Sequence, residues 1–210
     1  MQHKTVFTAA ANWHTHVNHV QASPKMADWL SNRDSLTERL VAHSQQFRVQ
    51  RLYQGRARCL QDEFMEIDLP RVQQVVEREV LLCCDEVPVV YAHTVLPLHA
   101  NAYQWPLFAS LGNRSLGTTL FSDPLVQRGP LQYARLRPAH PLMRRIAGLA
   151  LLELSEQSEL SELSELGESY LLARRSVFTR HGSKLLVTEV FLPALSALSL
   201  NAVGVTAELV

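Results

Sequence analysis

The chain has few cysteines, no long apolar run and no excess of charge of either sign. Its three cysteines, Cys59, Cys83 and Cys84, follow no spacing pattern, which argues against a disulfide framework and favours a reducing cytoplasm. The longest apolar stretch, near 146–152, is far shorter than the ~20 residues of a membrane span, and residues 1–12 lack the pattern of a secretory signal. Twenty basic residues balance twenty acidic ones, which gives no electrostatic case for a nucleic-acid partner or an anionic membrane. We therefore expect a soluble cytoplasmic protein.

Motifs of the common cofactor and nucleophile sites are absent as well. No Gly-x-Gly-x-x-Gly, P-loop or Gly-x-Ser-x-Gly sequence occurs, and no cysteine lies at a clear helix start. His14, His16 and His19 could ligate a metal ion, but they lack a carboxylate or thiolate partner at a recognised spacing and lie in an unpatterned segment. The sequence therefore gives no indication of a nucleotide cofactor, and the three histidines do not indicate a metal site.

Helix start signals and apolar spacing predict several short helices in a chain that is 47% hydrophobic. Ser23 is an N-cap candidate with a proline directly after it, so a helix should begin there. Ser35 and Glu38 have the capping-box spacing, which predicts a second helix. Further helical segments are expected at 104–111 and 116–121.

Alternating and apolar runs predict strands that pair as hairpins. A strand should start at Phe47 and end at Gly55, and another is expected near 59–64. Two hairpins are expected, with strands at 78–84 and 89–96 around residues 85–88, and at 170–179 and 184–192 around residues 181–183. Hairpins with helices inserted between them predict the α+β class with an antiparallel sheet.

We expect one domain over residues 1–210, with its core at about 25–193. Residues 1–22 are polar and predict a weakly ordered leader. Between 153 and 169 a glutamate recurs every three residues without a neutralising Lys or Arg, which predicts a solvated low-complexity insertion. Residues 194–210 form an apolar C-terminal extension. No exposed apolar repeat suggests an interface, so we expect a monomer.

Two charged side chains lie on strands that should otherwise be apolar. Arg78 shares its face with Val80 and Leu82, and Glu189 shares its face with Val187. A charge on an inward face is unfavourable unless it is paired or binds a ligand, so both are candidate site residues. The alternatives are a structural Arg78–Glu189 ion pair, or two edge residues whose charged ends reach water.

Several pieces of the sequence occur in an order that resembles a known family. They are Trp29-Leu30, Asp34-Ser35-Leu36-Thr37, Arg78 to Cys83, a turn ending at Pro88, Thr94 to Pro97, Leu111-Gly112, Leu116-Gly117, Leu120-Phe121, Arg174-Arg175-Ser176 and Leu186 to Pro193. Together they resemble chorismate lyase, also called chorismate pyruvate-lyase, over about residues 25–193 apart from the acidic insertion.

The resemblance implies a six-stranded antiparallel sheet with helices and helical flaps that cover an internal ligand pocket. It implies conversion of chorismate into 4-hydroxybenzoate and pyruvate, the committed step toward ubiquinone, with tight retention of the product. It also implies that neither a metal nor an organic cofactor takes part.

Residue roles follow from the resemblance by position. Arg78 matches the arginine that grips the ring carboxylate, and Glu189 matches the glutamate at the 4-hydroxyl end. Leu36 and Leu116 match residues whose backbone amides help to hold the carboxylate. The sequence departs from the family at four positions. Leu36 stands where a methionine is frequent, Glu86 where a turn glycine is frequent, His93 where an arginine is frequent, and Ser115 where a proline is frequent.

The chemistry leaves two roles open for Glu189. Loss of the C3 ether bond and the C4 hydrogen makes the ring aromatic, so the enzyme must position and polarise rather than supply a strong nucleophile. Glu189 could take the C4 hydrogen as a base, or could only orient the ring while that hydrogen moves to the enolpyruvyl methylene.

A rival from another class is a non-catalytic binding or sensor domain, related to the effector-binding domains of repressors. Such repressors carry an N-terminal winged helix-turn-helix, and no basic recognition helix precedes the first core helix here. Formation of 4-hydroxybenzoate from chorismate separates the two hypotheses.

Overall fold

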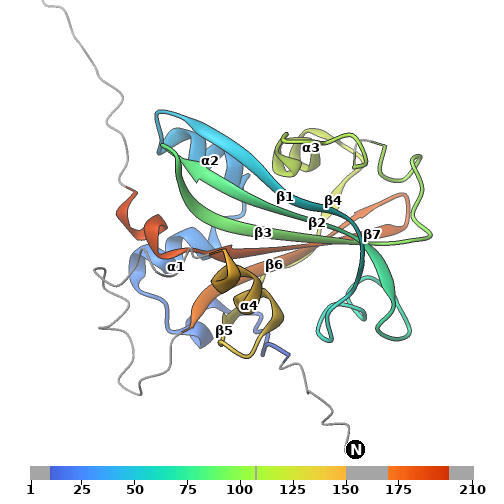
Figure 1. Ribbon diagram of the computed structural model, residues 1–210, viewed down its shortest axis with the longest axis horizontal. Coiled ribbons are helices and arrows are strands. Elements are labelled where there is room, and N and C mark those ends of the chain that lie inside the picture. Colours follow the sequence, from blue (N-terminus) through green and yellow to red (C-terminus); the bar gives the residue numbers. More distant parts are fainter. Residues whose placement is uncertain (1–9, 107, 150–169, 199–210) are drawn as a thin grey trace, which may run out of the picture.

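The computed structural model describes residues 10–106, 108–149 and 170–198. Figure 1 shows the elements coloured along the chain. The helices are the 3₁₀ turns η1 (Val17–Val20) and η3 (Pro193–Ala197) and the α-helices α1 (Pro24–Ser31), α2 (Leu36–Ala42), α3 (Leu116–Ser122) and α4 (Pro141–Gly148). The strands are β1 (Phe47–Arg58), β2 (Gln74–Cys84), β3 (Val87–Pro97), β4 (Gln127–Arg128), β5 (Gln132–Leu136), β6 (Leu171–Arg180) and β7 (Ser183–Phe191). None of the described helices is long and apolar enough to span a bilayer.

In the described part of the chain, seven strands form one antiparallel sheet in the order β1-β2-β3-β7-β6-β4, and β5 also pairs with β6. The predicted α+β class and antiparallel sheet are confirmed, with one strand more than the resemblance implied. Both predicted hairpins are present, as β2–β3 and β6–β7. Their turns, Asp85-Glu86 and His181-Gly182, have positive φ at both residues, the backbone that matches the twist of paired strands.

The first two helices begin where their caps predict. Ser23 Oγ accepts the N–H of Met26 at 3.3 Å, and Pro24 takes the first position of α1. Ser35 Oγ accepts the N–H of Glu38 at 3.3 Å at the start of α2. The helix expected at 116–121 is confirmed as α3. Local capping therefore sets the start of α1 and α2, and α2 is one of the two helices that cover the site described below.

Helices cover both faces of the sheet (Figure 1). One face packs under α1, α2 and α3, and the other packs against α4 and the segment between β1 and β2. Neighbouring residues of β2 alternate between these two layers: Leu82 joins the cluster of Leu36, whereas Leu81 joins the cluster of Leu142. The side chain of Arg78 therefore points to the layer beneath α2 and α3.

Three local predictions are wrong. The first strand does not end at Gly55, because β1 keeps its pairing with β2 through Arg58. Residues 59–64 form turns rather than a strand, and the Leu60 N–H donates to the Glu63 carboxylate at 2.8 Å instead of to a neighbouring strand. The described residues between 104 and 111 also form turns where a helix was expected. No sequence signal was assigned to β4, β5 or α4.

Residues 10–22 are not the weakly ordered leader that their polarity predicts. His14 pairs with β5 through backbone hydrogen bonds of 2.8 Å. Trp13 Nε1 donates to Asp62 Oδ2 at 2.8 Å, and Val20 is buried in the core. A few well-placed anchors thus fix a segment whose average composition is polar.

Two other sequence expectations fall on residues that are not described. The acidic insertion at 153–169 lies wholly outside the described residues. The C-terminal extension is described only as far as residue 198, and within it Leu195 is buried against the core.

Candidate active site

Four residues singled out from the sequence line one cavity between the sheet and two helices. Arg78 comes from β2 and Glu189 from β7, while Leu36 and Leu116 are the first residues of α2 and α3. Most of the remaining lining is apolar, including the strand residues that share a face with Arg78. The alternation of side chains on the two strands thus places both odd charges in the same cavity.

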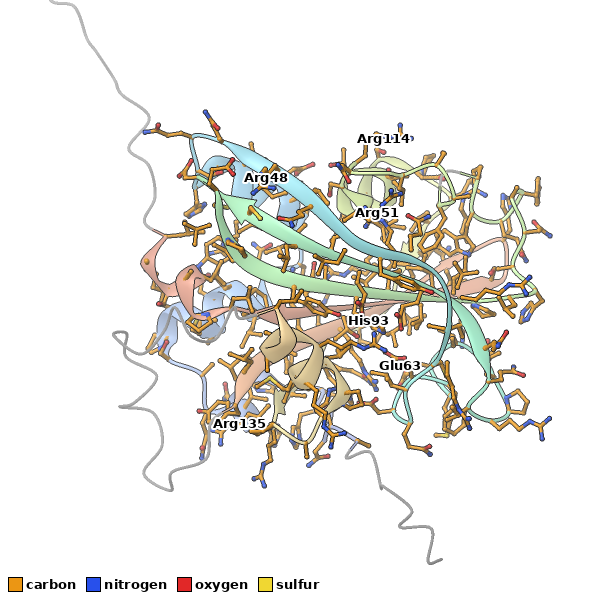
Figure 2. All side chains as sticks on the ribbon, viewed as in Figure 1. Arg48, Arg51, Glu63, His93, Arg114 and Arg135 are labelled. Atoms are coloured by element: carbon orange, nitrogen blue, oxygen red, sulfur yellow. The ribbon has the colours of Figure 1, made fainter. Side chains whose placement is uncertain are left out.

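Arg78 is a buried cation that no carboxylate of the described residues contacts. Its side chain is 2% exposed, and Nη2 donates to the carbonyl oxygens of Gly112 at 3.1 Å and Arg114 at 2.9 Å. Its Nε is buried and meets no acceptor among the described residues. Burial, and to a smaller extent the positive charge of Arg51, lowers the pKa of Arg78 to about 10. Figure 2 shows Arg51 and Arg114 on the α3 side of the molecule. A guanidinium in this condition is stabilised by an anion that enters the cavity.

Glu189 forms its ion pair with Arg174 and not with Arg78. Arg174 Nε donates to Glu189 Oε2 at 2.6 Å, and the two residues face each other in the β6–β7 register. Arg174 Nη1 also donates to the carbonyl oxygens of Trp29, Leu30 and Asn32, between 2.7 and 3.2 Å. The structural Arg78–Glu189 pair considered above is therefore wrong, and so is the view that either residue merely reaches water at an edge.

Arg174 and Arg128 also line the cavity, and neither is among the site residues expected from the sequence. Arg174 follows the same rule as Arg78, a charge on the inward face of an apolar strand, so this signal was available. Arg128 belongs to the two-residue strand β4, which has too few residues to show any periodicity.

Arg128 is held only in part by the protein. Its Nη1 donates to the carbonyl oxygen of Arg33 at 2.7 Å, whereas its Nε is buried without an acceptor among the described residues. The guanidinium carbon lies 5.3 and 5.5 Å from the ring centroids of Phe121 and Phe178. Burial lowers the pKa of Arg128.

The two helices that cover the cavity contact each other at their first turns. Thr37 Oγ1 and Ser115 Oγ are hydrogen-bonded at 2.6 Å. Gly117 lies beside this contact, and a Cβ at its position would come within 2.9 Å of Thr37 Oγ1. A small residue therefore suits the place where α3 approaches α2.

The charges of the cavity do not balance. Three guanidinium groups face it against the single carboxylate of Glu189, an excess of two positive charges. In an apolar enclosure such an excess is stabilised by anionic ligands more than it would be in water. The cavity is therefore suited to a small organic anion.

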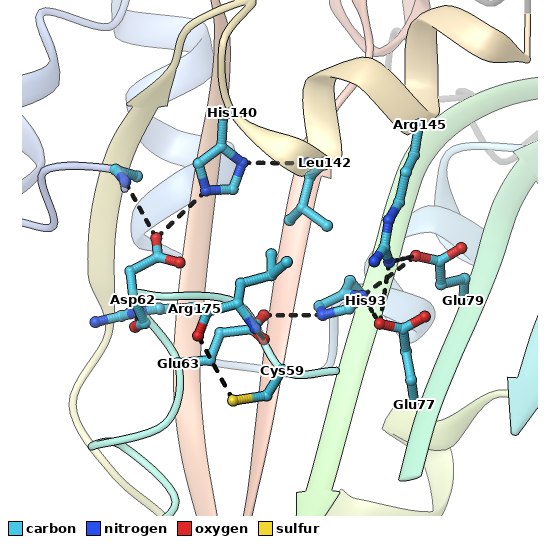
Figure 3. A network of polar contacts seen from close by, with 12 residues as sticks. Cys59, Asp62, Glu63, Glu77, Glu79, His93, His140, Leu142, Arg145 and Arg175 are labelled. Atoms are coloured by element: carbon cyan, nitrogen blue, oxygen red, sulfur yellow. Dashed lines mark hydrogen bonds and ion pairs between the residues drawn. The ribbon is translucent and has the colours of Figure 1, made fainter. Parts of the chain in front are cut away.

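A second buried charge cluster lies on the opposite face of the sheet, where α4 covers it (Figure 3). Glu77 and Glu79 project from β2, His93 faces them from β3, and Arg145 reaches them from α4. Arg145 Nη1 lies 3.0 Å from Glu77 Oε2 and also contacts Glu79 Oε1. His93 Nε2 lies 2.8 Å from an oxygen of Glu63, and Figure 2 shows these two residues together below β3. This cluster is separate from the cavity because it uses the other face of β2.

In this cluster, neighbouring opposite charges together shift the pKa values of His93 and Glu79 more than burial does. Burial lowers the pKa of His93, but Glu63 and Glu79 raise it to about 10. Burial likewise raises the pKa of Glu79, but hydrogen bonds, led by that from His93, and the charge of Arg145 lower it to about 2. Glu77, Glu79 and His93 are the one group in the described part of the chain whose spacing could suit a metal ion. Since Arg145 already contacts both carboxylates, we interpret the group as a structural ion network within the protein.

Comparison with known proteins supports the resemblance seen in the sequence. The family model described as chorismate lyase matches residues 7–198. A "Probable chorismate pyruvate-lyase" of Cupriavidus metallidurans is 44% identical over 186 residues, which cover 88% of this chain and 81% of that protein. A protein of the same description from Ralstonia nicotianae is 47% identical over 170 residues, which cover 81% of this chain and 82% of that protein. Another from Nitrosospira multiformis is 38% identical over 190 residues, which cover 90% of this chain and 97% of that protein.

Solved structures with a similar arrangement are more distant. The effector domain of PhnF from Mycobacterium smegmatis has a TM-score of 0.46 at 16% identity and covers 77% of this chain and 90% of that chain. A PhnF C-terminal domain has a TM-score of 0.44 at 12% identity, and the match covers 74% of this chain and 88% of that chain. The family model and the curated relatives are much more specific than these likenesses. Because they span most of the chain, they show that the protein belongs to the chorismate lyase family.

Proposed function

We propose that the protein converts chorismate into 4-hydroxybenzoate and pyruvate. The observation that carries the proposal is Arg78, a buried guanidinium with no carboxylate partner in the described part of the chain, in the same cavity as Glu189. A carboxylate on a ring would supply the missing partner, and the family relationship supports chorismate as the source of that carboxylate. The product 4-hydroxybenzoate would then enter ubiquinone synthesis.

Arg78 holds the ring carboxylate in this proposal. Nη2 already donates to two carbonyl oxygens, so the guanidinium offers the carboxylate its unpartnered Nε–H together with Nη1, and these charge-assisted bonds fix the ring in position. The backbone N–H groups of Leu36 and Leu116 lie in the first turns of α2 and α3, where no intrahelical acceptor exists for them. We assign them to the same carboxylate, a contact for which the side chain of Leu36 serves as well as methionine.

Glu189 receives the 4-hydroxyl end of the ring. Its Oε2 is held by Arg174, whereas Oε1 accepts no hydrogen bond from the described residues and is free for the substrate hydroxyl. The four hydrogen bonds of Arg174 fix the carboxylate in place, which suits an orienting role. The base role for the C4 hydrogen stays open beside it.

The reaction needs little beyond this placement. The C3–O bond breaks, the C4 hydrogen leaves the ring, and enolpyruvate gains a hydrogen at its methylene to become pyruvate. Formation of the aromatic ring drives these changes, and an apolar cavity keeps water away from the reacting carbons. The described residues supply orientation and charge, which is what such a reaction requires.

Purified protein mixed with chorismate tests the proposal. We expect equal amounts of 4-hydroxybenzoate, followed by its absorbance, and pyruvate, followed by coupled reduction with lactate dehydrogenase. A protein that binds 4-hydroxybenzoate but forms no pyruvate would instead be the sensor considered above. Arg78→Lys is the matched variant, because it keeps the charge and removes the planar guanidinium with its unpartnered Nε donor.

We also propose that the protein acts as a monomer in the cytoplasm. Its described cysteines are all buried and unpaired, which suits a reducing compartment. Sedimentation over a hundredfold range of concentration measures the oligomeric state, and a constant mass of one chain is expected.

A further inference from the structure

Two of the three arginines that line the cavity lack partners for their Nε atoms. Arg174 uses Nε for its ion pair with Glu189 and Nη1 for three carbonyl oxygens. Arg78 and Arg128 each have a buried Nε that no acceptor reaches among the described residues. A buried N–H of a cation without an acceptor is unfavourable, so each marks a place where an oxygen of a ligand belongs.

These two places lie in different parts of the cavity. Arg78 comes from β2 and Arg128 from β4, and β3, β7 and β6 lie between these two strands in the sheet. Arg128 is also fixed from the side of β6, because its strand position pairs with Phe178. The two guanidinium groups are therefore set to receive two separate anionic groups of one ligand.

Chorismate carries two carboxylates, one on the ring and one on the enolpyruvyl ether at C3. With the ring carboxylate on Arg78 and the C4 hydroxyl at Glu189, the neighbouring C3 substituent lies toward the Glu189 end. There its carboxylate would be repelled by Glu189 unless a cation were present. We infer that Arg128 binds the enolpyruvyl carboxylate through its free Nε edge, an inference that rests on the proposed function.

The charge of the cavity agrees with a dianionic ligand. The two excess positive charges of the lining are balanced by chorismate, whereas 4-hydroxybenzoate, with one carboxylate, balances only one. Phe121 and Phe178 flank the guanidinium of Arg128 and hold its plane, which leaves its edge to the ligand. Arg128 therefore distinguishes the substrate from the product, whereas Arg78 binds both.

Kinetics of Arg128→Gln and Arg128→Lys test this role in the full-length protein. A charge-assisted hydrogen bond accounts for about 10- to 100-fold in binding, so we expect KM for chorismate to rise by about that factor in Arg128→Gln. The Kd of 4-hydroxybenzoate should change less than about threefold, and Arg128→Lys should recover part of the KM. Arg48→Gln removes the same charge from an exposed site on β1 and should leave all values unchanged.

Binding of two probes reads the same role without turnover. The dicarboxylate 3-(1-carboxyvinyloxy)benzoate should lose about 10- to 100-fold in affinity for Arg128→Gln, whereas benzoate should not. Equal loss for both probes, or no loss for the dicarboxylate, would overturn the inference even if the wild type turns over chorismate. A wild type that forms no pyruvate but shows the selective loss would refute the proposed function and leave the dianion site in place.

Discussion

Replacing Arg78 with methionine should change ligand affinity and protein stability in different directions. Methionine is unbranched and adaptable, so it can follow the path of the arginine stem between the apolar side chains of the cavity. It removes the charge and the donors together. An ordinary core substitution weakens the fold and, through the fold, the function. A residue kept for its ligand should instead weaken function alone.

The expected loss of affinity follows from the contacts that Arg78 offers. A ring carboxylate held by two charge-assisted N–H bonds, each worth about 1.5–3 kcal/mol, loses about 3–5 kcal/mol in the variant. The Kd of 4-hydroxybenzoate should rise by about 10²- to 10⁴-fold. Titration with tryptophan fluorescence or calorimetry measures the change at neutral pH.

The expected change of stability follows from the lowered pKa. At neutral pH Arg78 is protonated in the folded and the unfolded chain, and its folded pKa of about 10 means that the fold disfavours the cation. This unfavourable contribution is constant below about pH 10 and shrinks as pH rises above it. Methionine removes it but also leaves the carbonyl groups of Gly112 and Arg114 without that donor. We expect the free energy of unfolding to stay equal or to rise by up to about 2 kcal/mol.

Urea denaturation at pH 7, with and without saturating 4-hydroxybenzoate, measures both effects in one experiment. The wild type should gain stability from the ligand, and Arg78→Met should gain almost none. Arg48→Met serves as the control, since it removes an exposed arginine of the neighbouring strand. A variant that loses several kcal/mol of stability, or that binds the product within threefold of the wild type, would refute the reasoning.

Three further predictions concern Glu189 in the cavity, the contact between α2 and α3 that covers it, and the charge cluster on the α4 face of the sheet. Glu189→Gln should keep its circular dichroism and unfolding transition but lose at least about 100-fold in kcat, measured by 4-hydroxybenzoate formation. Gly117→Ala should raise the Kd of 4-hydroxybenzoate because the new methyl displaces Thr37, whereas Gly148→Ala, with open space around it, should not. The pKa of His93 is raised in the fold, so its contribution to stability is complete below about pH 6.5 and lost as pH rises toward about 10. His93→Gln should flatten this part of the pH profile of urea unfolding, and a parallel profile would contradict the assignment.

The parts of the fold that could be predicted are those with a local physical cause. The N-caps Ser23 and Ser35 and the strand alternation around Arg78 act over a few residues, so their patterns are visible in the chain itself. The short strands β4 and β5 depend on pairing with β6 and show too little periodicity. Residues 104–111 have a helical composition, but contacts with other segments hold the described part of them in turns, as when Trp105 Nε1 donates to Ser183.

The candidate site divides in the same way. The alternation rule placed Arg78 and Glu189 on inward faces, but the partner of each depends on strand order, which pairs Glu189 with Arg174 and leaves Arg78 without a carboxylate. Arg128 could not be found because its strand has two residues and no apolar pattern around it. Register between distant strands is a property of the packed sheet, and no short pattern in the sequence specifies it.

Strand β2 separates two kinds of buried charge within three consecutive residues. Glu77 and Glu79 point to the α4 face, where Arg145 contacts both carboxylates, so these charges are neutralised by the protein itself. Arg78 points to the other face, where its acceptors among the described residues are two carbonyl oxygens. Burial alone therefore does not mark a functional residue in this fold, because all three side chains are almost fully buried. The distinguishing property is an unmet counter-charge, and it is the substrate that must supply it.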